Sequence, residues 1–474
     1  MKGNKFANRT LWLAGLGLVI VLGLAIGLML AFSGPQNNPA TTTSPVAANP
    51  TGAPVGTNPT GTTPAITNPP GESAVSMPVN PTSQAAQQAP GSIATVTPAP
   101  KADIKGQLDA SWTDYSKRFI QADGRVMDPQ QAALTTSEGQ SYALLRAVWE
   151  NDQATFKRVL SWTQSNLQTR GTDKLFAFKW GQGSDGQWHV LDKNSASDAD
   201  SDIALALLFA AKTWGDDNYQ KLGLDVLNSL WEKSVVTVNN KPYLTAGDWA
   251  VSQDRPALNP SYLAPYAYRI FAAFDRGHDW NALVDTSYEV IQGCSTATLD
   301  GQGGKNLPPN FCGINKKDGS FTTAQDYPSL NINYGYDAFR TNWRLALDYK
   351  WFGDKRDLEL LKANSLPRDI FKQTGKLGAE YDHSGKLTNG EEDLAIYSGT
   401  LGNFIVTDPQ LADTLVNSKL LPAYKNITDN DFARAFVGWG DTRNYYNQNW
   451  VWFGLALYSD NLPNLAANSV STSK

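Results

Sequence analysis

The sequence predicts an all-α fold, a ring of about twelve helices paired as hairpins, with a cleft at the end where the longer loops gather. Beyond Ile104, apolar residues recur at helical spacing in about twelve separate runs. Short turns such as Trp214–Asp217 join the runs in pairs, and longer loops rich in Gly, Asn and Trp separate the pairs. An α-solenoid is the alternative, but the chain has no fixed repeat period.

The expected helices begin directly after the N-terminal region and continue almost to the C-terminus. The spacing is clear where Ile203, Leu207 and Trp214 recur along one segment. The expected ranges are 105–120, 138–150, 153–167, 200–214, 217–233, 261–275, 279–292, 336–350, 354–372, 391–404, 408–423 and 446–459.

Composition divides the 474 residues into an N-terminal appendage and one globular body. Fourteen of the 26 prolines lie between Pro35 and Pro100, whereas 14 of the 15 tryptophans lie at or beyond Trp112. We therefore expect three parts. They are an N-terminal membrane anchor or signal segment over 1–33, a Pro/Thr/Ala-rich disordered linker over 34–104, and a globular domain over 105–465.

The first part contains an apolar run, Leu11–Phe32, without a charged residue. Its 22 residues are enough to cross a hydrocarbon core of about 30 Å as a transmembrane helix. Lys2, Lys5 and Arg9 precede the run, and this positive flank favours a cytoplasmic N-terminus. A cleavable signal peptide is the alternative, although its apolar core is usually about 7–15 residues long. We expect a single-pass protein of the cell membrane with the globular domain outside the cytoplasm, or a secreted protein if the segment is cleaved.

The second part has the composition of a spacer. Between Gly34 and Lys101 the chain is mostly Pro, Thr, Ala, Asn, Gly and Ser, and Glu72 is its only charged residue. Such a segment has too little apolar surface to offset the entropy of ordering it. We expect an extended, partly polyproline linker that holds the globular domain away from the membrane.

Charge and rare residues exclude several classes of function. The net charge is −5, and it is about −7 for the globular body once the three cations and one anion before Lys101 are set aside. An acidic body without a Lys/Arg run argues against nucleic acid as a partner. The three histidines and two cysteines have no metal-ligand spacing, so we expect no metal and no cofactor. We also expect a monomer.

The two cysteines, Cys294 and Cys312, bracket a loop rich in Gly, Asn and Pro. If this loop lies outside the cytoplasm, its surroundings are oxidising, and a disulfide between the two residues is expected. Two buried free thiols are the alternative.

Two single acids stand at the starts of expected helices. Glu138 begins the helix within Thr135–Tyr142, and the spacing from Thr135 to Glu138 also fits a capping box, in which the acid has only a structural role. Asp337 lies at the start of the helix expected over 336–350, which also contains Arg340, and an N-cap is its structural alternative. Each structural interpretation is plausible when its segment is considered alone.

A third helix start holds three acids within five residues, Asp198, Asp200 and Asp202. Ser197 and Asp200 fit a second capping box, and acids suit the positive end of a helix dipole. Capping leaves the other two acids unexplained. An EF-hand calcium loop is excluded, because the sixth position of the segment is Ile203 rather than Gly.

Taken together, the three helix starts predict a shared site, because the loop ends of hairpins in a ring can converge on one cleft. Paired carboxyl groups in an aromatic cleft are what glycosidic cleavage requires, one to protonate the leaving oxygen and one to activate water. Aromatic rings can stack on the faces of sugars, and several occur in the loops: Trp180, Trp188, Trp249, Tyr262, Tyr445 and Tyr446.

The segment ASDADSDIALALLFAAKTW at 196–214 resembles the signature of glycoside hydrolase family 8. Four further segments resemble the family and stand in the same order along the chain. They are Ser137–Tyr142, Asn259–Tyr262, Gly335–Arg340 and Tyr445–Gln448. The resemblance covers most of the globular domain, from about 138 to 459.

The resemblance implies an (α/α)6 barrel and an inverting endo-β-1,4-glycanase, mostly of the cellulase type. It implies that Glu138 is the general acid, that Asp337 is the general base, and that Asp198 binds the distorted sugar at the cleaved bond. It also implies supporting roles for further residues, with stacking positions for the two tryptophans. These are Arg340, Tyr262, Tyr446, Trp180 and Trp249.

Two departures from the family pattern leave the substrate open. The chain has Asn447 where the family often has Asp, and Thr341 where some cellulases carry an aromatic residue. Cellulose or mixed-linkage glucan is the expected substrate, with chitosanase or xylanase activity as the runner-up. A non-catalytic, membrane-tethered glycan-binding protein is the alternative from another class, and the presence of all three acids argues against it.

Overall fold

Helices make up most of the structure, a computed structural model that describes residues 101–252, 254–431 and 434–469. Within this part of the chain there are thirteen α-helices. They are α2 (Lys101–Arg118), α3 (Ser137–Trp149), α4 (Gln153–Asn166), α5 (Ser197–Trp214), α6 (Asp217–Ser234), α7 (Pro265–Phe274), α8 (Trp280–Thr296), α9 (Arg340–Phe352), α10 (Lys355–Ala363), α11 (Leu366–Thr374), α12 (Leu394–Thr407), α13 (Pro409–Leu415) and α14 (Tyr445–Tyr458).

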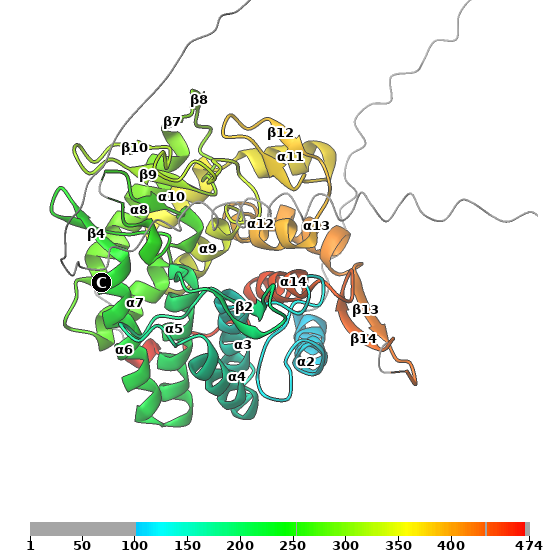
Figure 1. The fold of residues 1–474 in the computed structure, drawn as a ribbon. Helices are drawn as coiled ribbons and strands as arrows, with labels where there is room; N and C mark the ends of the chain where they lie inside the picture. The colour runs from blue at the N-terminus through cyan, green and yellow to red at the C-terminus, as the bar shows by residue number, and fades with distance from the viewer. Residues whose placement is uncertain (1–100, 253, 432–433, 470–474) are drawn as a thin grey trace, which may run out of the picture. The chain divides into compact units, whose positions relative to one another are not determined.

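Six of these helices lie next to one another in a ring, in the order α3, α5, α7, α9, α12 and α14. Aromatic contacts between Tyr142 and Trp450 and between Trp149 and Trp452 join α14 to α3 and complete it. Each of α4, α6, α8, α10 and α13 packs on the ring helix that precedes it, and α2 packs on α14 (Figure 1). The arrangement is consistent with an (α/α)6 barrel.

Burial explains which helices lie in the ring. In α5 every residue from Ser197 to Ala211 is buried, as expected for a helix with neighbours on all sides. Its partner α6 instead buries a stripe that includes Tyr219, Val226 and Leu230 and leaves the opposite face polar, so it packs on the ring from outside.

Several expected helix ranges differ from the structure. The range 354–372 is two helices, α10 and α11, because the chain leaves the helix at Asn364 and Pro367 lies in the first turn of α11. The range 261–275 becomes a short 3-10 turn followed by α7, which begins at Pro265. The range 408–423 becomes α13 and a π-turn, and α9 begins at Arg340 rather than at 336.

Short strands also occur between the helices, so the fold is mostly helical rather than all-α. Fourteen strands occur in the described residues, the longest of five residues. They are β1 (Thr135–Thr136), β2 (Lys179–Gln182), β3 (Trp188–Asp192), β4 (Val235–Val238), β5 (Lys241–Leu244), β6 (Ala257–Leu258), β7 (Thr298–Leu299), β8 (Gln302–Gly303), β9 (Cys312–Ile314), β10 (Phe321–Thr322), β11 (Glu380–Tyr381), β12 (Leu387–Asn389), β13 (Tyr424–Ile427) and β14 (Phe436–Trp439).

Two small sheets matter for the site, and their strands pair antiparallel. The first has the order β1-β2-β3 and joins the start of α3 to the loop between α4 and α5. The second has the order β10-β9-β6, and β6 leads into the turn that carries Asn259. Both sheets therefore brace segments from which site residues come.

The expected membrane anchor over 1–33 lies outside the described residues, as does nearly all of the expected linker over 34–104. The linker range ends too late, because α2 begins at Lys101. Among the described helices, none combines the length and apolar character that a bilayer span requires.

Candidate active site

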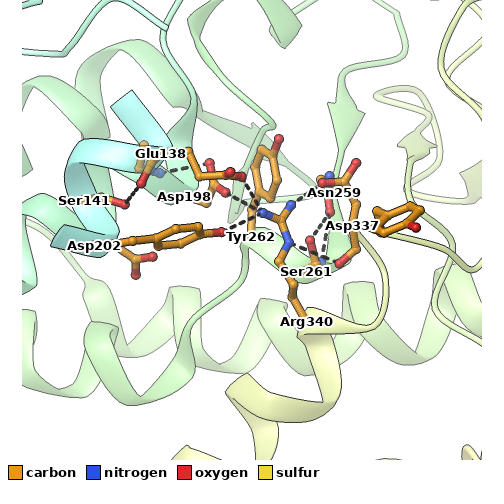
Figure 2. A network of polar contacts seen from close by, with 12 residues as sticks. Glu138, Ser141, Asp198, Asp202, Asn259, Ser261, Tyr262, Asp337 and Arg340 are labelled. Atoms are coloured by element: carbon orange, nitrogen blue, oxygen red, sulfur yellow. Dashed lines mark hydrogen bonds and ion pairs between the residues drawn. The ribbon is translucent and has the colours of Figure 1, made fainter. Parts of the chain in front are cut away.

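One buried guanidinium, that of Arg340, gathers the three acids that the sequence singled out. Arg340 is the first residue of α9 and is 1% exposed. Its Nη1 lies 2.7 Å from Glu138 Oε2 and 3.4 Å from Asp198 Oδ2, and its Nη2 binds Asp337 Oδ1 (Figure 2). The three segments thus come together, as expected, and the group that they share is one cation, which the helix starts alone did not predict.

Glu138 is the second residue of α3, but it caps nothing. The N-cap is Thr136, whose hydroxyl oxygen accepts a hydrogen bond from the Gly139 amide at 3.0 Å. Thr135 lies in β1 and donates its hydroxyl to the Val126 carbonyl at 2.7 Å. The capping-box interpretation of Glu138 is therefore wrong, and its carboxylate is directed to Arg340 instead.

The acids of the second motif have three different partners. Asp198 binds Arg340, and Asp200 accepts a hydrogen bond from the Phe176 amide at 2.9 Å. Asp202 forms a bidentate pair with Arg344, with both N–O distances at 3.0 Å. The second capping box is also wrong, since Ser197 is the first residue of α5 and its hydroxyl donates to the Thr245 carbonyl.

Asp337 lies in a turn three residues before α9, whose N-cap position is occupied by Phe339. The N-cap interpretation of Asp337 is therefore wrong as well. Arg340 binds its carboxylate, and the amide of Asn259 lies beside it. The side-chain oxygen of Asn259, Oδ1, accepts hydrogen bonds from the backbone amide and the hydroxyl of Ser261. This orients the side-chain nitrogen of Asn259 toward Asp337 (Figure 2).

Burial and mutual repulsion raise the pKa values of these carboxyl groups. Burial raises the pKa of Glu138, which Arg340 opposes and the charge of Asp337 reinforces. Burial raises the pKa of Asp198 to about 7 in spite of Arg340, with Glu138 adding to the rise. Burial also raises the pKa of Asp337, whereas Arg340 and Asn259 lower it. One cation among three acids favours retention of a proton within the cluster.

Access to solvent differs among the three acids. The side chain of Asp198 is 3% exposed, that of Glu138 is 20% exposed, and that of Asp337 is 33% exposed. Asp337 is therefore the member of the cluster best placed to contact a water molecule, whereas Asp198 lies at its buried end.

Two of the predicted aromatic residues border the cluster. The Tyr262 ring lies 5.3 Å from the Arg340 guanidinium carbon, a cation–π contact. Tyr446, in α14, donates its hydroxyl to the carbonyl of Tyr336, the residue before Asp337, at 3.1 Å. Both tyrosines are partly buried, so part of each ring remains available beside the acids.

The two predicted tryptophans belong to two other segments of the chain. Trp180 is on β2, where it pairs with Thr135 of β1. Trp249 belongs to a short 3-10 turn and packs edge-on against Tyr327, with ring centroids 5.3 Å apart. Tyr262 packs against the same small apolar cluster as Trp249.

Two residues of the site, Tyr142 and Asn259, were not predicted from the sequence. Tyr142, 3% exposed, places its hydroxyl 3.3 Å from Arg340 Nη1. It resembled a core residue of α3, although it is four residues after Glu138 and hence on the same helix face. Asn259 lies in the segment Asn259–Tyr262, which resembles the family, but nothing in the sequence predicts that its side-chain amide lies beside Asp337.

Thr341, the second residue of α9, is buried. It is 1% exposed and lines a separate cavity of about 500 Å³ between α8, α9 and α10.

Cys294 of α8 and Cys312 of β9 are joined by a disulfide, which ties the loop between them to the end of α8.

The sequence model of glycosyl hydrolases family 8 matches residues 93–420. The chain belongs to this family. The match includes Glu138, Asp198, Asp337 and Arg340, and it ends before Tyr446.

Relatives and solved structures agree with the assignment. The chain is 34% identical to an endoglucanase of Escherichia coli over 262 residues, which are 54% of this chain and 66% of the relative. It is 32% identical to endoglucanase A of Acetivibrio thermocellus over 266 residues, 54% of this chain and 52% of the relative. These alignments span between half and two thirds of each relative. The crystal structure of an endo-1,4-D-glucanase from Vibrio fischeri has the same fold, with a TM-score of 0.61, 23% identity, and coverage of 74% of this chain and 95% of that one.

Proposed function

We propose that this family 8 hydrolase is an endo-acting, inverting enzyme that cleaves β-1,4-glucan, either cellulose or mixed-linkage glucan. The observation that carries the proposal is the binding of Glu138 and Asp337 to different nitrogens of one buried guanidinium, with Asp198 beside them. Two carboxyl groups bound to different nitrogens of one cation, with Asp337 33% exposed to solvent, fit an inverting displacement in which one of them activates water.

In this mechanism Glu138 is the general acid and donates a proton to the leaving glycosidic oxygen. Its raised pKa keeps that proton available at a pH where an ordinary glutamate has lost it. Asp337 is the general base and removes a proton from the water that attacks the anomeric carbon from the opposite face. Arg340 and Asn259 stabilise its ionised form, and its exposure gives water access to it.

Asp198 then serves to bind substrate. Its buried position and its pKa near 7 suit a group that exchanges hydrogen bonds with sugar hydroxyls rather than one that must remain ionised. Tyr262 and Tyr446 border the cleaved bond, and Trp180 and Trp249 stack on sugar units further along the chain. Carboxyl groups and water suffice for this chemistry, so no cofactor is needed.

The substrate class rests on the relatives. The two relatives reported above are named endoglucanases, which favours glucan over other β-linked polysaccharides. Chitosanase activity is the second candidate, because the globular body carries a net charge of about −7 and chitosan is cationic.

We further propose that the (α/α)6 barrel over 105–465 works outside the cytoplasm. The uncharged 22-residue run at Leu11–Phe32 would anchor it in the cell membrane, with 34–104 as a spacer. If the anchor is retained, detergent should be required to release a chain of the full calculated mass, 51.6 kDa. A soluble mature chain that begins near Gly34 would contradict this and indicate secretion.

The central experiment is an assay of reducing-sugar release from cellulose, mixed-linkage glucan, xylan and chitosan, combined with proton NMR of the first products. We expect release from the glucans and an inverted anomeric configuration at early times. Retention of configuration would contradict the roles given to Glu138 and Asp337, because it requires a carboxylate nucleophile. Release from chitosan alone would favour the second candidate.

A further inference from the structure

The cavity that Thr341 lines is not part of the three-acid cluster. It has a volume of about 500 Å³, within the range of small-molecule sites, and lies between α8, the start of α9 and α10. Thr341 and Leu345 of α9 line it, and each follows directly after an arginine that faces α5, Arg340 or Arg344. Successive side chains of a helix diverge by about 100°, so the cavity and the acids lie on different faces of α9.

The loop that closes one side of the cavity is fixed by the disulfide. Asn306 and Pro308 line the cavity and belong to the segment between Cys294 and Cys312. The backbone amide of Asn306 also donates a hydrogen bond to the Ser295 carbonyl at 3.1 Å. A site whose walls are already in place loses less conformational entropy when it binds a ligand.

The buried part of the lining holds neutral polar groups that lack partners. Thr341 is 1% exposed and Asn364 is 4% exposed. The side-chain nitrogen of Asn364 donates to Asn342 Oδ1 at 2.9 Å, which fixes the plane of the Asn364 amide. Within the described residues, neither Thr341 Oγ1 nor Asn364 Oδ1 has a hydrogen-bond partner. Since buried polar atoms are almost always hydrogen-bonded, we expect the missing partners to come from a molecule in the cavity.

The exposed part of the lining excludes an anionic ligand. Three acids, Asp285, Glu289 and Glu359, are found there with one cation, Arg356. A phosphate or an acidic sugar would therefore meet a surplus of negative charge. A cationic ligand is not favoured either, because Arg356 pairs with Asp285 at 2.7 Å and Lys241 pairs with Glu289. The groups that remain available to a ligand are mostly neutral.

We infer that this cavity binds a short neutral saccharide of one or two sugar units. Sugar hydroxyls both donate and accept hydrogen bonds, so they can serve Thr341 and Asn364 together. The apolar side chains of Ile291, Leu345 and Leu360 line the cavity and can contact the C–H groups of the sugar. Short glucose oligomers are what the proposed function releases, so the inference rests on that function for the identity of its ligand.

The test counts the binding events of the β-1,4-linked glucose dimer by calorimetry, in the full chain with Glu138→Gln to prevent cleavage. We expect two events, one at the acids and one in the cavity. Leu360→Trp fills the cavity from α10 and should remove the second event alone, whereas Asp198→Ala should remove the first alone. Leu358→Trp is the matched control and should keep both, because Leu358 is a half-buried residue of the same helix that does not line the cavity.

Thr341→Val tests the unpartnered hydroxyl. It should weaken the second event about fivefold, the effect of one lost hydrogen bond, and should not lower the melting temperature of the ligand-free chain. An unchanged affinity would overturn the contact with Thr341. A single event in the parent, a second event that survives Leu360→Trp, or loss of both events in Asp198→Ala would overturn the site and leave the cavity to water.

Two further measurements separate the ligand class and the proposed function. Tighter binding of the β-1,4-linked glucosamine dimer, abolished by Glu359→Gln, would overturn the neutral class. Cleavage of glucan by the unsubstituted chain is measured alongside. Cleavage without a second binding event would overturn the cavity site alone, and a second binding event without cleavage would overturn the proposed function alone.

Discussion

Arg340 and Arg344 lie one turn apart on α9, and each faces an acid from the start of α5. Arg340 contacts Asp198, and Arg344 contacts Asp202, so the two pairs repeat at a spacing of four residues on both helices. A tyrosine hydroxyl completes each pair, that of Tyr142 at 3.3 Å from Arg340 and that of Tyr266 at 2.8 Å from Arg344.

The two sites differ in the ratio of charges. Arg344 and Asp202 form one bidentate ion pair, buried and balanced. Arg340 instead serves three carboxylates. Burial raises the pKa of each of them, and one shared cation offsets this only in part, so one of the three can hold a proton. The same residue types on the same helices therefore give a structural contact where charges match and a proton-transfer site where they do not.

The largest expected effect comes from the proton donor. Glu138→Gln should lower turnover at least about a hundredfold, because the amide cannot protonate the leaving oxygen. Thermal stability should change little, since Thr136 and not Glu138 caps α3. Glu150→Gln, at the other end of the same helix, is the control and should keep its activity. A Glu138→Gln enzyme that keeps its rate but melts earlier would restore the capping interpretation.

Loss of the general base should lower turnover nearly as much, but an added nucleophile should restore part of it. Asp337→Ala should lose at least about a hundredfold in turnover, and azide, a small external nucleophile, should restore part of it. Asp198→Ala should be similarly inactive and should not respond to azide, since Asp198 binds sugar. Azide rescue is measured as the rate against azide concentration at fixed substrate. Rescue of Asp198→Ala alone would exchange the two roles.

Much of this comparison could be predicted from the sequence. The three acids, Arg340 and the ring of paired helices follow from helical spacing and from the segments that resemble the family. The break between α10 and α11 was also readable, because Pro367 cannot continue a helix from the preceding turn.

The capping errors have a different cause. The residue that caps α3 is set by the pairing of β1 with β2, in which Thr136 lies opposite Lys179 more than forty residues away. Thr135 and Thr136 are equally good caps in the sequence, so local spacing cannot choose between them. In the same way, the Asp202–Arg344 pair depends on which helices are neighbours in the ring, and spacing within one helix does not reveal that.

The two aspartates of α5 should differ in stability when each becomes asparagine. Asp202→Asn leaves Arg344 buried without a counter-charge and should cost about 3–5 kcal/mol of unfolding free energy. Asp198→Asn leaves Arg340 with two carboxylates and should cost little. Both values come from denaturant unfolding at neutral pH. Similar losses in the two variants would mean that the charge ratio does not distinguish the sites.

The stability of Asp198→Asn relative to the parent chain should also depend on pH. The pKa of Asp198 is about 7 in the folded chain and near its ordinary value of 3.8 in the unfolded one. Between these values the folded state binds more protons, so the contribution of Asp198 to stability is lost as the pH rises from 4 to 7. Asparagine does not titrate. The stability of the variant relative to the parent should therefore increase over this range, and a constant difference would contradict the raised pKa.

The smallest effect is expected at the two tyrosines. The Tyr142 hydroxyl lowers the pKa of Glu138, so Tyr142→Phe should raise that pKa and move the basic limb of the kcat/KM profile to higher pH. The rate at the optimum should fall less than about tenfold, the range of one lost hydrogen bond. Tyr266→Phe removes the matching hydroxyl beside Arg344, where no carboxyl group transfers a proton. It should lower the unfolding free energy without moving either limb. Equal shifts in both variants would mean that the profile reports general damage to α9, whereas a shift to lower pH in Tyr142→Phe would mean that the hydroxyl stabilises the protonated form of Glu138.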